Sequence, residues 1–201
     1  MTGVMASDRP RPGRQRSEAA DHAILSATLD LLSETGYGAL TVAAVIARSG
    51  VSSATLYRRW PTKQDLVAAA LASLHAEVVD IDTGSLATDI AAMVRSTAQA
   101  MTVKREDIAQ DIAIELRRNP EFRAAINEKF IQPRRALMAG IIERAVARGE
   151  LGDGLGVDVA TAFVTGPLHH WVYVQGRTPD VRMQRTVVTG ALAALSAIAP
   201  A

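Results

Sequence analysis

The chain has 201 residues, which is enough for one large domain or two small ones. Its formal net charge is only +1, so a wholly basic coat for wrapping nucleic acid is excluded, whereas a local basic site is not. Cysteine is absent, which excludes disulfides, iron–sulfur clusters and cysteine-ligated zinc. Alanine occurs 36 times and aromatic residues make up 4% of the chain, which favours an all-α fold.

The first 17 residues are predicted to form a flexible basic arm. They contain four arginines together with proline and glycine, and their apolar residues follow no helical or strand period. Flexible basic arms can add minor-groove or phosphate contacts, so Arg14 and Arg16 are candidates for such contacts. No apolar stretch follows these arginines, which argues against a secretory signal. We expect a cytoplasmic protein.

Residues 18–78 are predicted to form a small helical domain. Apolar residues from Ala20 to Leu31 recur at spacings of four, three and four, which indicates a helix that begins at Ser17 and ends at Gly36 and Gly38.

Two shorter helices follow in quick succession. Thr41 can cap the first of them, and Gly50 ends it. Ser52 or Ser53 can cap the second, which ends before Pro61. A helix, a tight turn and a second short helix are typical of a helix-turn-helix, whose second helix fits a DNA major groove about 12 Å wide.

The next helix starts with a polar cap and a lysine. Thr62 can cap it, with Asp65 completing a shortened capping box. Lys63 lies in the first turn, where its positive charge opposes the helix dipole. Local helix stability therefore does not explain this lysine, whereas a DNA phosphate would.

Residues 50–66 read GVSSATLYRRWPTKQDL and resemble the tetracycline-repressor (TetR) family of bacterial transcriptional regulators. The family pattern is Gly-Val-Ser, then Thr-Leu-Tyr, an aromatic residue, Lys and Leu at fixed spacings, and every fixed element is present, with Trp60 as the aromatic. The resemblance is specific over residues 18–78. It implies a DNA-binding transcriptional regulator, with Leu56 and Val51 in the domain core.

The resemblance also implies roles for individual residues. The positions that usually hold DNA phosphates are Thr41, Ser52, Thr55, Tyr57 and Lys63. The positions that usually read base edges are Ser53, Ala54 and Arg58. One residue departs from the pattern: Ala43 stands where some members use arginine to reach guanine. Guanine reading would then fall to Arg58, Arg59 or the N-terminal arginines.

Residues 79–201 are predicted to form a second helical domain, which brings the total to about nine helices. Asn119-Pro120-Glu121 and Thr178-Pro179-Asp180 each read as a helix start with a cap, a proline and an acid. Pro133 is expected to kink or break one helix and Gly166-Pro167 to kink another. The uncharged stretches near the C-terminus are interrupted or too short to span a membrane, so no membrane partner is expected.

The family resemblance implies that this second domain binds an effector and forms a homodimer on a pseudo-palindromic operator. The pocket candidates are apolar or aromatic, which favours an apolar or aromatic effector; they are Met101, Phe122, Phe130, Phe163, His170 and Trp171. The interface candidates lie on the last two helices, and they are Val164, Leu168, Val188, Leu192 and Leu195.

Two other functions are open to this sequence. One is a small helical enzyme with His169 or His170 as a base beside Glu115 or Glu143, although nothing pairs these groups in the sequence. Adjacent histidines point to different helix faces and do not readily chelate one ion, so neither a metal nor a cofactor is expected. The other is an interaction module whose helix-turn-helix meets protein instead of DNA.

Overall fold

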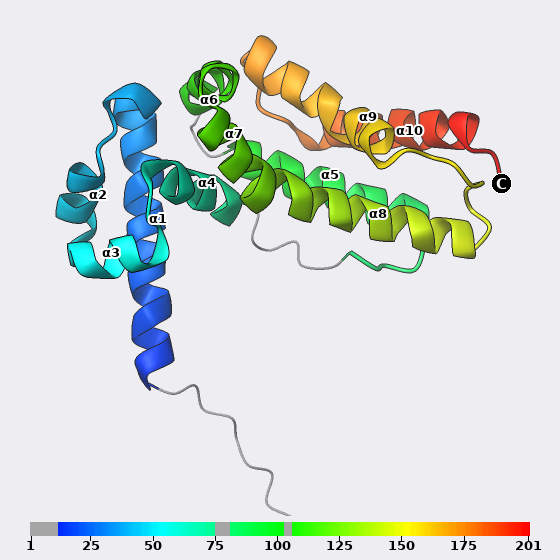
Figure 1. The fold of residues 1–201 in the computed structure, drawn as a ribbon. Coiled ribbons are helices and arrows are strands. Elements are labelled where there is room, and N and C mark those ends of the chain that lie inside the picture. Colours follow the sequence, from blue (N-terminus) through cyan, green and yellow to red (C-terminus); the bar gives the residue numbers. More distant parts are fainter. Residues whose placement is uncertain (1–11, 75–80, 103–105) are drawn as a thin grey trace, which may run out of the picture.

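The structure is a computed structural model that describes residues 12–74, 81–102 and 106–201 (Figure 1). The elements within these ranges are helices: α1 (Pro12–Ala39), α2 (Val42–Ser49), α3 (Ser53–Arg59), α4 (Lys63–Ser73), α5 (Leu86–Thr102), α6 (Glu106–Arg118), α7 (Pro120–Ile126), α8 (Gln132–Ala147), α9 (Val157–His169) and α10 (Val181–Ile198). Two π-helical turns, η1 (Asn127–Ile131) and η2 (His170–Val174), continue α7 into α8 and extend α9. Nine continuous helices result over the described ranges, which confirms the all-α prediction.

The predicted helix caps of the N-terminal part are confirmed. The Thr41 hydroxyl accepts a hydrogen bond from the Ala44 N–H at 3.1 Å, and the Thr62 hydroxyl accepts one from the Asp65 N–H at 3.0 Å. Gly50 ends α2 with a φ of 68°, a conformation that costs glycine little because it has no Cβ. These side chains satisfy backbone groups that a helix end leaves without partners.

The start of α1 differs from the prediction. The helix begins at Pro12, so the backbone that carries Arg14 and Arg16 is helical and not a flexible arm. Proline is compatible with a helix start, because its fixed φ is helical and its missing N–H has no partner there. Residues 1–11, the rest of the predicted arm, lie outside the described residues, and so does the predicted boundary at residue 78.

The first hydrophobic core lies among α1, α2, α3 and α4. Ile24, Val45, Leu56 and Leu66 are its fully buried centre, and Val51 packs against them, as the family resemblance implied for Leu56 and Val51. The core also includes side chains of α7, which come from the predicted second domain. The helix-turn-helix is therefore built directly onto the C-terminal part of the chain.

The second core lies among α5, α8, α9 and α10, which run beside one another in Figure 1. Its fully buried centre includes Ile90, Met138, Ile141, Leu168 and Leu195. Helices α6 and α7 lie between this bundle and the N-terminal helices. Helix α6 contacts α1, and α7 contacts α4. None of the described helices is long and apolar enough to cross a membrane.

Two prolines coincide with the π-helical turns. Pro133 lies in the first turn of α8, directly after η1, so the chain widens there but is not broken. Proline has no N–H to donate to the preceding turn, and a wider turn accommodates that loss. Pro167 lies inside α9, and η2 follows it. The predicted disturbances therefore take the form of π turns within continuous helices.

Candidate DNA-binding surface and effector groove

Helix α3 has one buried face and one exposed face. Leu56 and Trp60 point into the core, whereas Ser53, Ala54 and Arg58 are exposed and Tyr57 has 50% of its surface exposed. Ser52 caps the helix by accepting from the Thr55 N–H, and its hydroxyl lies 3.0 Å from the Thr55 hydroxyl. Short polar groups therefore surround the exposed start of a helix, where backbone N–H groups and the helix dipole favour phosphate.

The two adjacent arginines of α3 have different surroundings. Arg59 forms an ion pair with Asp21 of α1 at 2.7 Å, and only 18% of its side chain is exposed. Arg58 is exposed and forms no ion pair with the described residues. Arg59 therefore joins α3 to α1, and Arg58 is the arginine of α3 that is available for base reading. The sequence could not separate the two, because their difference arises from a residue 38 positions away.

Lys63 has a partner within the protein. Its ammonium donates to the Tyr37 carbonyl oxygen at 2.6 Å and lies 4.3 Å from the centre of the Tyr37 ring. Burial lowers the pKa of Lys63, and the nearby Glu115 carboxylate opposes that effect. Tertiary contacts therefore explain this lysine as well as a DNA phosphate would, and its phosphate contact stays a prediction.

Tyr37 joins α1 to α6 and α7 within the first core, a role that the sequence did not reveal. Its backbone N–H donates to the Asp111 carboxylate of α6 at 3.2 Å, and its ring centre lies 4.7 Å from that of Phe122 of α7. Phe122 is fully buried here. Its assignment to an effector pocket is therefore corrected: this ring fills the core that joins α7 to the helix-turn-helix.

An inner groove of about 320 Å³ opens between α5, η1, α8, α9 and η2. It contains two of the predicted pocket residues, Met101 and Phe130, together with Arg134, His169 and Tyr173. The groove touches η1, which is continuous with α7, and α7 packs on α4. A molecule in the inner groove would therefore contact the helix that reaches the helix-turn-helix.

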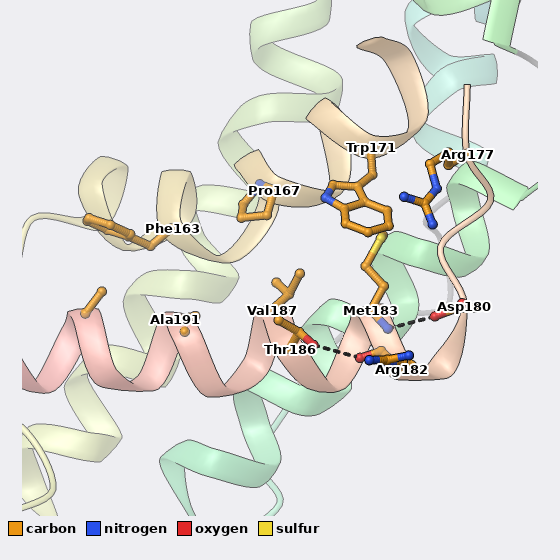
Figure 2. A pocket seen from close by; sticks show the side chains of 12 residues that line it. Phe163, Pro167, Trp171, Arg177, Asp180, Arg182, Met183, Thr186, Val187 and Ala191 are labelled. Atoms are coloured by element: carbon orange, nitrogen blue, oxygen red, sulfur yellow. Dashed lines mark hydrogen bonds between the residues drawn. The ribbon is translucent and has the colours of Figure 1, made fainter. Parts of the chain in front are cut away.

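An outer groove of about 620 Å³ lies between α9, η2 and α10. Figure 2 shows Phe163, Pro167 and Trp171 on one side of it and Met183 and Val187 of α10 on the other. The Arg177 guanidinium stacks over the Trp171 ring at 4.1 Å. The predicted pocket residues are thus divided between two grooves, with Phe163 and Trp171 in the outer one.

His170 lines neither of these two grooves. It is exposed, and its Nε2 accepts from the Gln175 amide at 3.1 Å. His169 bonds through Nδ1 to the Thr165 carbonyl oxygen at 2.8 Å. Glu115 accepts from the Asn119 amide. Within the described part of the chain no hydrogen bond or ion pair joins either histidine to Glu115 or Glu143, so the structure does not assemble the acid–base pair of the enzyme hypothesis.

Three of the five predicted dimer residues are buried within their own protomer. Val164, Leu168 and Leu195 are buried in the second core of their own protomer, and Val188 and Leu192 pack partly against it. The apolar stripe that the sequence shows on each helix is the stripe that covers α5 and α8. The exposed apolar side chains of α9 are instead Val159 and Phe163, each with 43% of its surface exposed.

These features define the class of the protein: an all-helical chain with an exposed recognition helix in a helix-turn-helix, joined to a bundle that contains a groove. Residues 24–70 match the family described as bacterial regulatory proteins, tetR family, and residues 80–191 match the tetracyclin repressor-like C-terminal domain. The chain belongs to the TetR family of DNA-binding transcriptional regulators. Its relatives and fold are those of regulators, which are not enzymes.

Individual relatives agree with this assignment over nearly the whole chain. The uncharacterized HTH-type transcriptional regulator YdeS of Bacillus subtilis is 28% identical over 92% of this chain and 94% of its own length. The DNA-binding transcriptional repressor TetR of Mycobacteroides abscessus is 30% identical over 86% of this chain and 92% of its own. The crystal structure of the TetR family regulator SCO0332 superposes with a TM-score of 0.68 at 25% identity, covering 87% of this chain and 97% of that one.

Proposed function

We propose that this protein is a homodimeric repressor that a small-molecule effector releases from a pseudo-palindromic operator in the bacterial cytoplasm. The main support for the proposal is the exposed face of α3. Its solvent-exposed residues are Ser53, Ala54, Tyr57 and Arg58. The bases are read by Ser53, Ala54 and Arg58. An α-helix that presents short polar groups and one free arginine matches the width and donor pattern of a major groove.

The phosphates are held by groups around the ends of α2 and α3. Thr41, Ser52, Thr55 and Tyr57 supply hydroxyls there, and all but Thr55 are exposed. Lys63 joins them once its ammonium leaves the Tyr37 carbonyl oxygen. Arg14 and Arg16 at the start of α1 extend the contact as supplementary cations. Phosphate contacts of this kind fix the position of a protein on DNA, whereas base contacts give its specificity.

Dimerisation uses the outward face of α9 and α10. Val159 and Phe163 supply apolar surface, and the small residues Gly166 and Gly190 are exposed on the same two helices and let a partner helix approach closely. A second copy seated there covers the outer groove. The two recognition helices then need to match half-sites whose centres lie about 34–36 Å apart, or a multiple of that distance.

The effector binds in the inner groove. Its lining comes from α5, η1, α8, α9 and η2, so a ligand contacts the helix that continues through α7 to α4. A ligand favours release only if it binds the released conformer more tightly than the DNA-bound one. We expect α7 to move relative to α4 on release from DNA and to change the shape of the inner groove. The affinity of the groove for the effector then differs between the two conformers.

A DNA-binding experiment tests the proposal. The full chain is mixed with the DNA upstream of its own gene in a gel-shift assay, and with a random-sequence library in a selection. We expect a discrete complex and an enriched sequence with two-fold symmetry. Failure to bind either DNA specifically would favour the interaction module, in which the helix-turn-helix meets protein.

A further inference from the structure

The inner groove contains a cation that lacks an anionic partner. The Arg134 guanidinium donates to the Thr97 hydroxyl at 3.1 Å and stacks 5.1 Å from the centre of the Phe130 ring. No carboxylate of the described residues lies within ion-pair distance of it. Burial lowers the pKa of Arg134, although arginine remains charged in proteins. A partly buried cation without a counter-charge is unfavourable, and a bound anion would offset that cost.

The other charged groups of the groove cancel one another. Arg135 forms an ion pair with Asp158. Burial and the charge of Arg134 hold the pKa of His169 below its ordinary value of 6.5, so its ring is neutral at pH 7. Burial raises the pKa of Tyr173 above 10, so its hydroxyl is neutral as well. The groove therefore carries a net charge of about +1, located on Arg134.

The two threonine hydroxyls that α9 contributes to the groove already have acceptors. Thr161 and Thr165 donate to carbonyl oxygens of their own helix, at 2.8 Å and 2.9 Å. The rest of the lining is apolar or aromatic and includes Met101, Phe130 and Ile131. The groove thus combines one forked donor with an apolar wall, and its volume lies at the lower end of the range of about 300–1,000 Å³ for ligand pockets.

We propose that the effector is a small amphipathic acid whose single carboxylate pairs with Arg134 and whose apolar, partly aromatic body lies against Met101 and Phe130. The planar guanidinium fork matches a carboxylate in two parallel hydrogen bonds, and Thr97 fixes its orientation. The inference rests on the proposed function and names the chemical class of its effector. Arg134 lies in the first turn of α8, and η1 joins α8 to α7. A carboxylate bound to Arg134 therefore contacts the same continuous helix that carries Phe122.

The test compares an acid with the matching alcohol on the full-length protein. The fluorescent probe N-phenyl-1-naphthylamine fills the groove and is displaced by 4-phenylbutyrate or by 4-phenylbutan-1-ol. The alcohol is the more apolar of the two, so it should displace the probe better from a site without a cation. We expect the acid to act at a concentration at least ten-fold lower on the wild-type protein. Arg134→Met should abolish that advantage, and Arg134→Lys should keep part of it.

A matched control comes from the outer groove. Arg177 also stacks on an aromatic ring but lies outside the inner groove, so Arg177→Met should keep the acid's advantage whatever its effect on dimerisation. The proposal is overturned if the alcohol equals the acid on the wild type, if Arg134→Met keeps the acid's advantage, or if Arg177→Met removes it. If circular dichroism shows that Arg134→Met does not fold, the wild-type comparison and Arg134→Lys still decide.

Gel shifts without ligand distinguish failure of the carboxylate site from failure of the repressor function. Loss of the acid preference with intact operator binding removes the carboxylate site alone. An acid preference in a protein that binds no operator supports the site and removes the repressor function.

Discussion

The adjacent residues Arg58 and Arg59 show how strongly the surroundings of a side chain decide its role. Both have the same chemistry and follow each other on one short helix. A helical step of about 100° turns Arg58 toward solvent and Arg59 toward Asp21 of α1. One is thereby available for DNA, and the other joins two helices of the domain.

Alanine substitutions should separate these two roles. Arg58→Ala should relax the preference at one base position by about 1–3 kcal/mol, because a bidentate contact with guanine is lost. Its thermal stability should not change. Arg59→Ala should keep the sequence preference and lower the unfolding temperature, because the contact with Asp21 is lost. Sequence selection and thermal unfolding measure the two effects. An unchanged preference in Arg58→Ala would remove this residue from base reading.

Gly36 gives a prediction about backbone geometry. Its φ of 74° and ψ of 169° lie in a region that essentially only glycine adopts, and an added Cβ would collide with the Asp111 carboxylate. Gly36→Ala should therefore lower the free energy of unfolding by about 1–3 kcal/mol or more. Gly38 has open space around its Cα, so Gly38→Ala is the control and should be nearly neutral. Equal stabilities in urea denaturation would contradict this assignment.

Lys63 gives a prediction about salt dependence. If its ammonium moves from Tyr37 to a phosphate in the complex, Lys63→Ala should lower the slope of log affinity against log salt by about 0.9, the value for one phosphate. Lys129, whose ammonium lies between Asp65 and Glu128, is the matched control, and Lys129→Ala should keep the slope. A loss of stability with an unchanged slope would restrict Lys63 to its contact with Tyr37.

The positions of most helix N-termini could be predicted from the sequence. Thr41, Ser52, Thr62 and Asn119 all cap helices as expected, because a cap depends on residues two or three positions apart. At the last helix the sequence predicts Thr178 as the cap, whereas the cap is Asp180. The effect of the prolines was predicted less well. Whether a proline breaks a helix or widens it into a π turn depends on the neighbours that hold the chain in place. Those neighbours come from distant segments.

Helix α7 gives a prediction at the scale of an element. Phe122 is fully buried between α7 and the helix-turn-helix, so Phe122→Ala should cost about 3–5 kcal/mol of stability. Ile114 on the neighbouring α6 is exposed, and Ile114→Ala should change stability by less than about 0.5 kcal/mol. Denaturant unfolding of both variants measures the difference. A small loss for Phe122→Ala would mean that α7 does not hold the DNA-binding helices.

The described part of the molecule has two cores, and the continuous helix of α7, η1 and α8 contributes to both. The first 65 residues hold eight basic and six acidic groups, whereas residues 66–201 hold 14 and 15, so the surplus of positive charge lies with the helix-turn-helix. Yet α6 packs on α1 and α7 packs on α4, so the DNA-binding helices are joined directly to the C-terminal helices. A compact DNA-binding domain needs only a few positioned cations. The near-neutral remainder of the chain limits non-specific binding to DNA.

Dimerisation gives a prediction about the whole molecule. Phe163→Glu places a charge on the outward face of α9 and should yield a folded monomer with strongly weakened operator binding. Val174→Glu is the control, because Val174 is also exposed but lies beyond the end of α9, in η2. Sedimentation velocity gives the oligomeric state. A Phe163→Glu dimer with normal operator affinity would place the interface elsewhere.

The sequence by itself determined the all-helical class, the helix-turn-helix, its caps and the family, because these depend on local spacing and on a motif of 17 residues. Which apolar residues lie in the core and which face outward could not be predicted from the sequence and is seen in the tertiary structure. Val164, Leu168 and Leu195 look like an interface in one dimension, but they cover α5 and α8. Likewise Phe122, Lys63 and Arg59 have partners far away in the chain. Burial and pairing depend on neighbours in space, and periodicity along one helix cannot identify them.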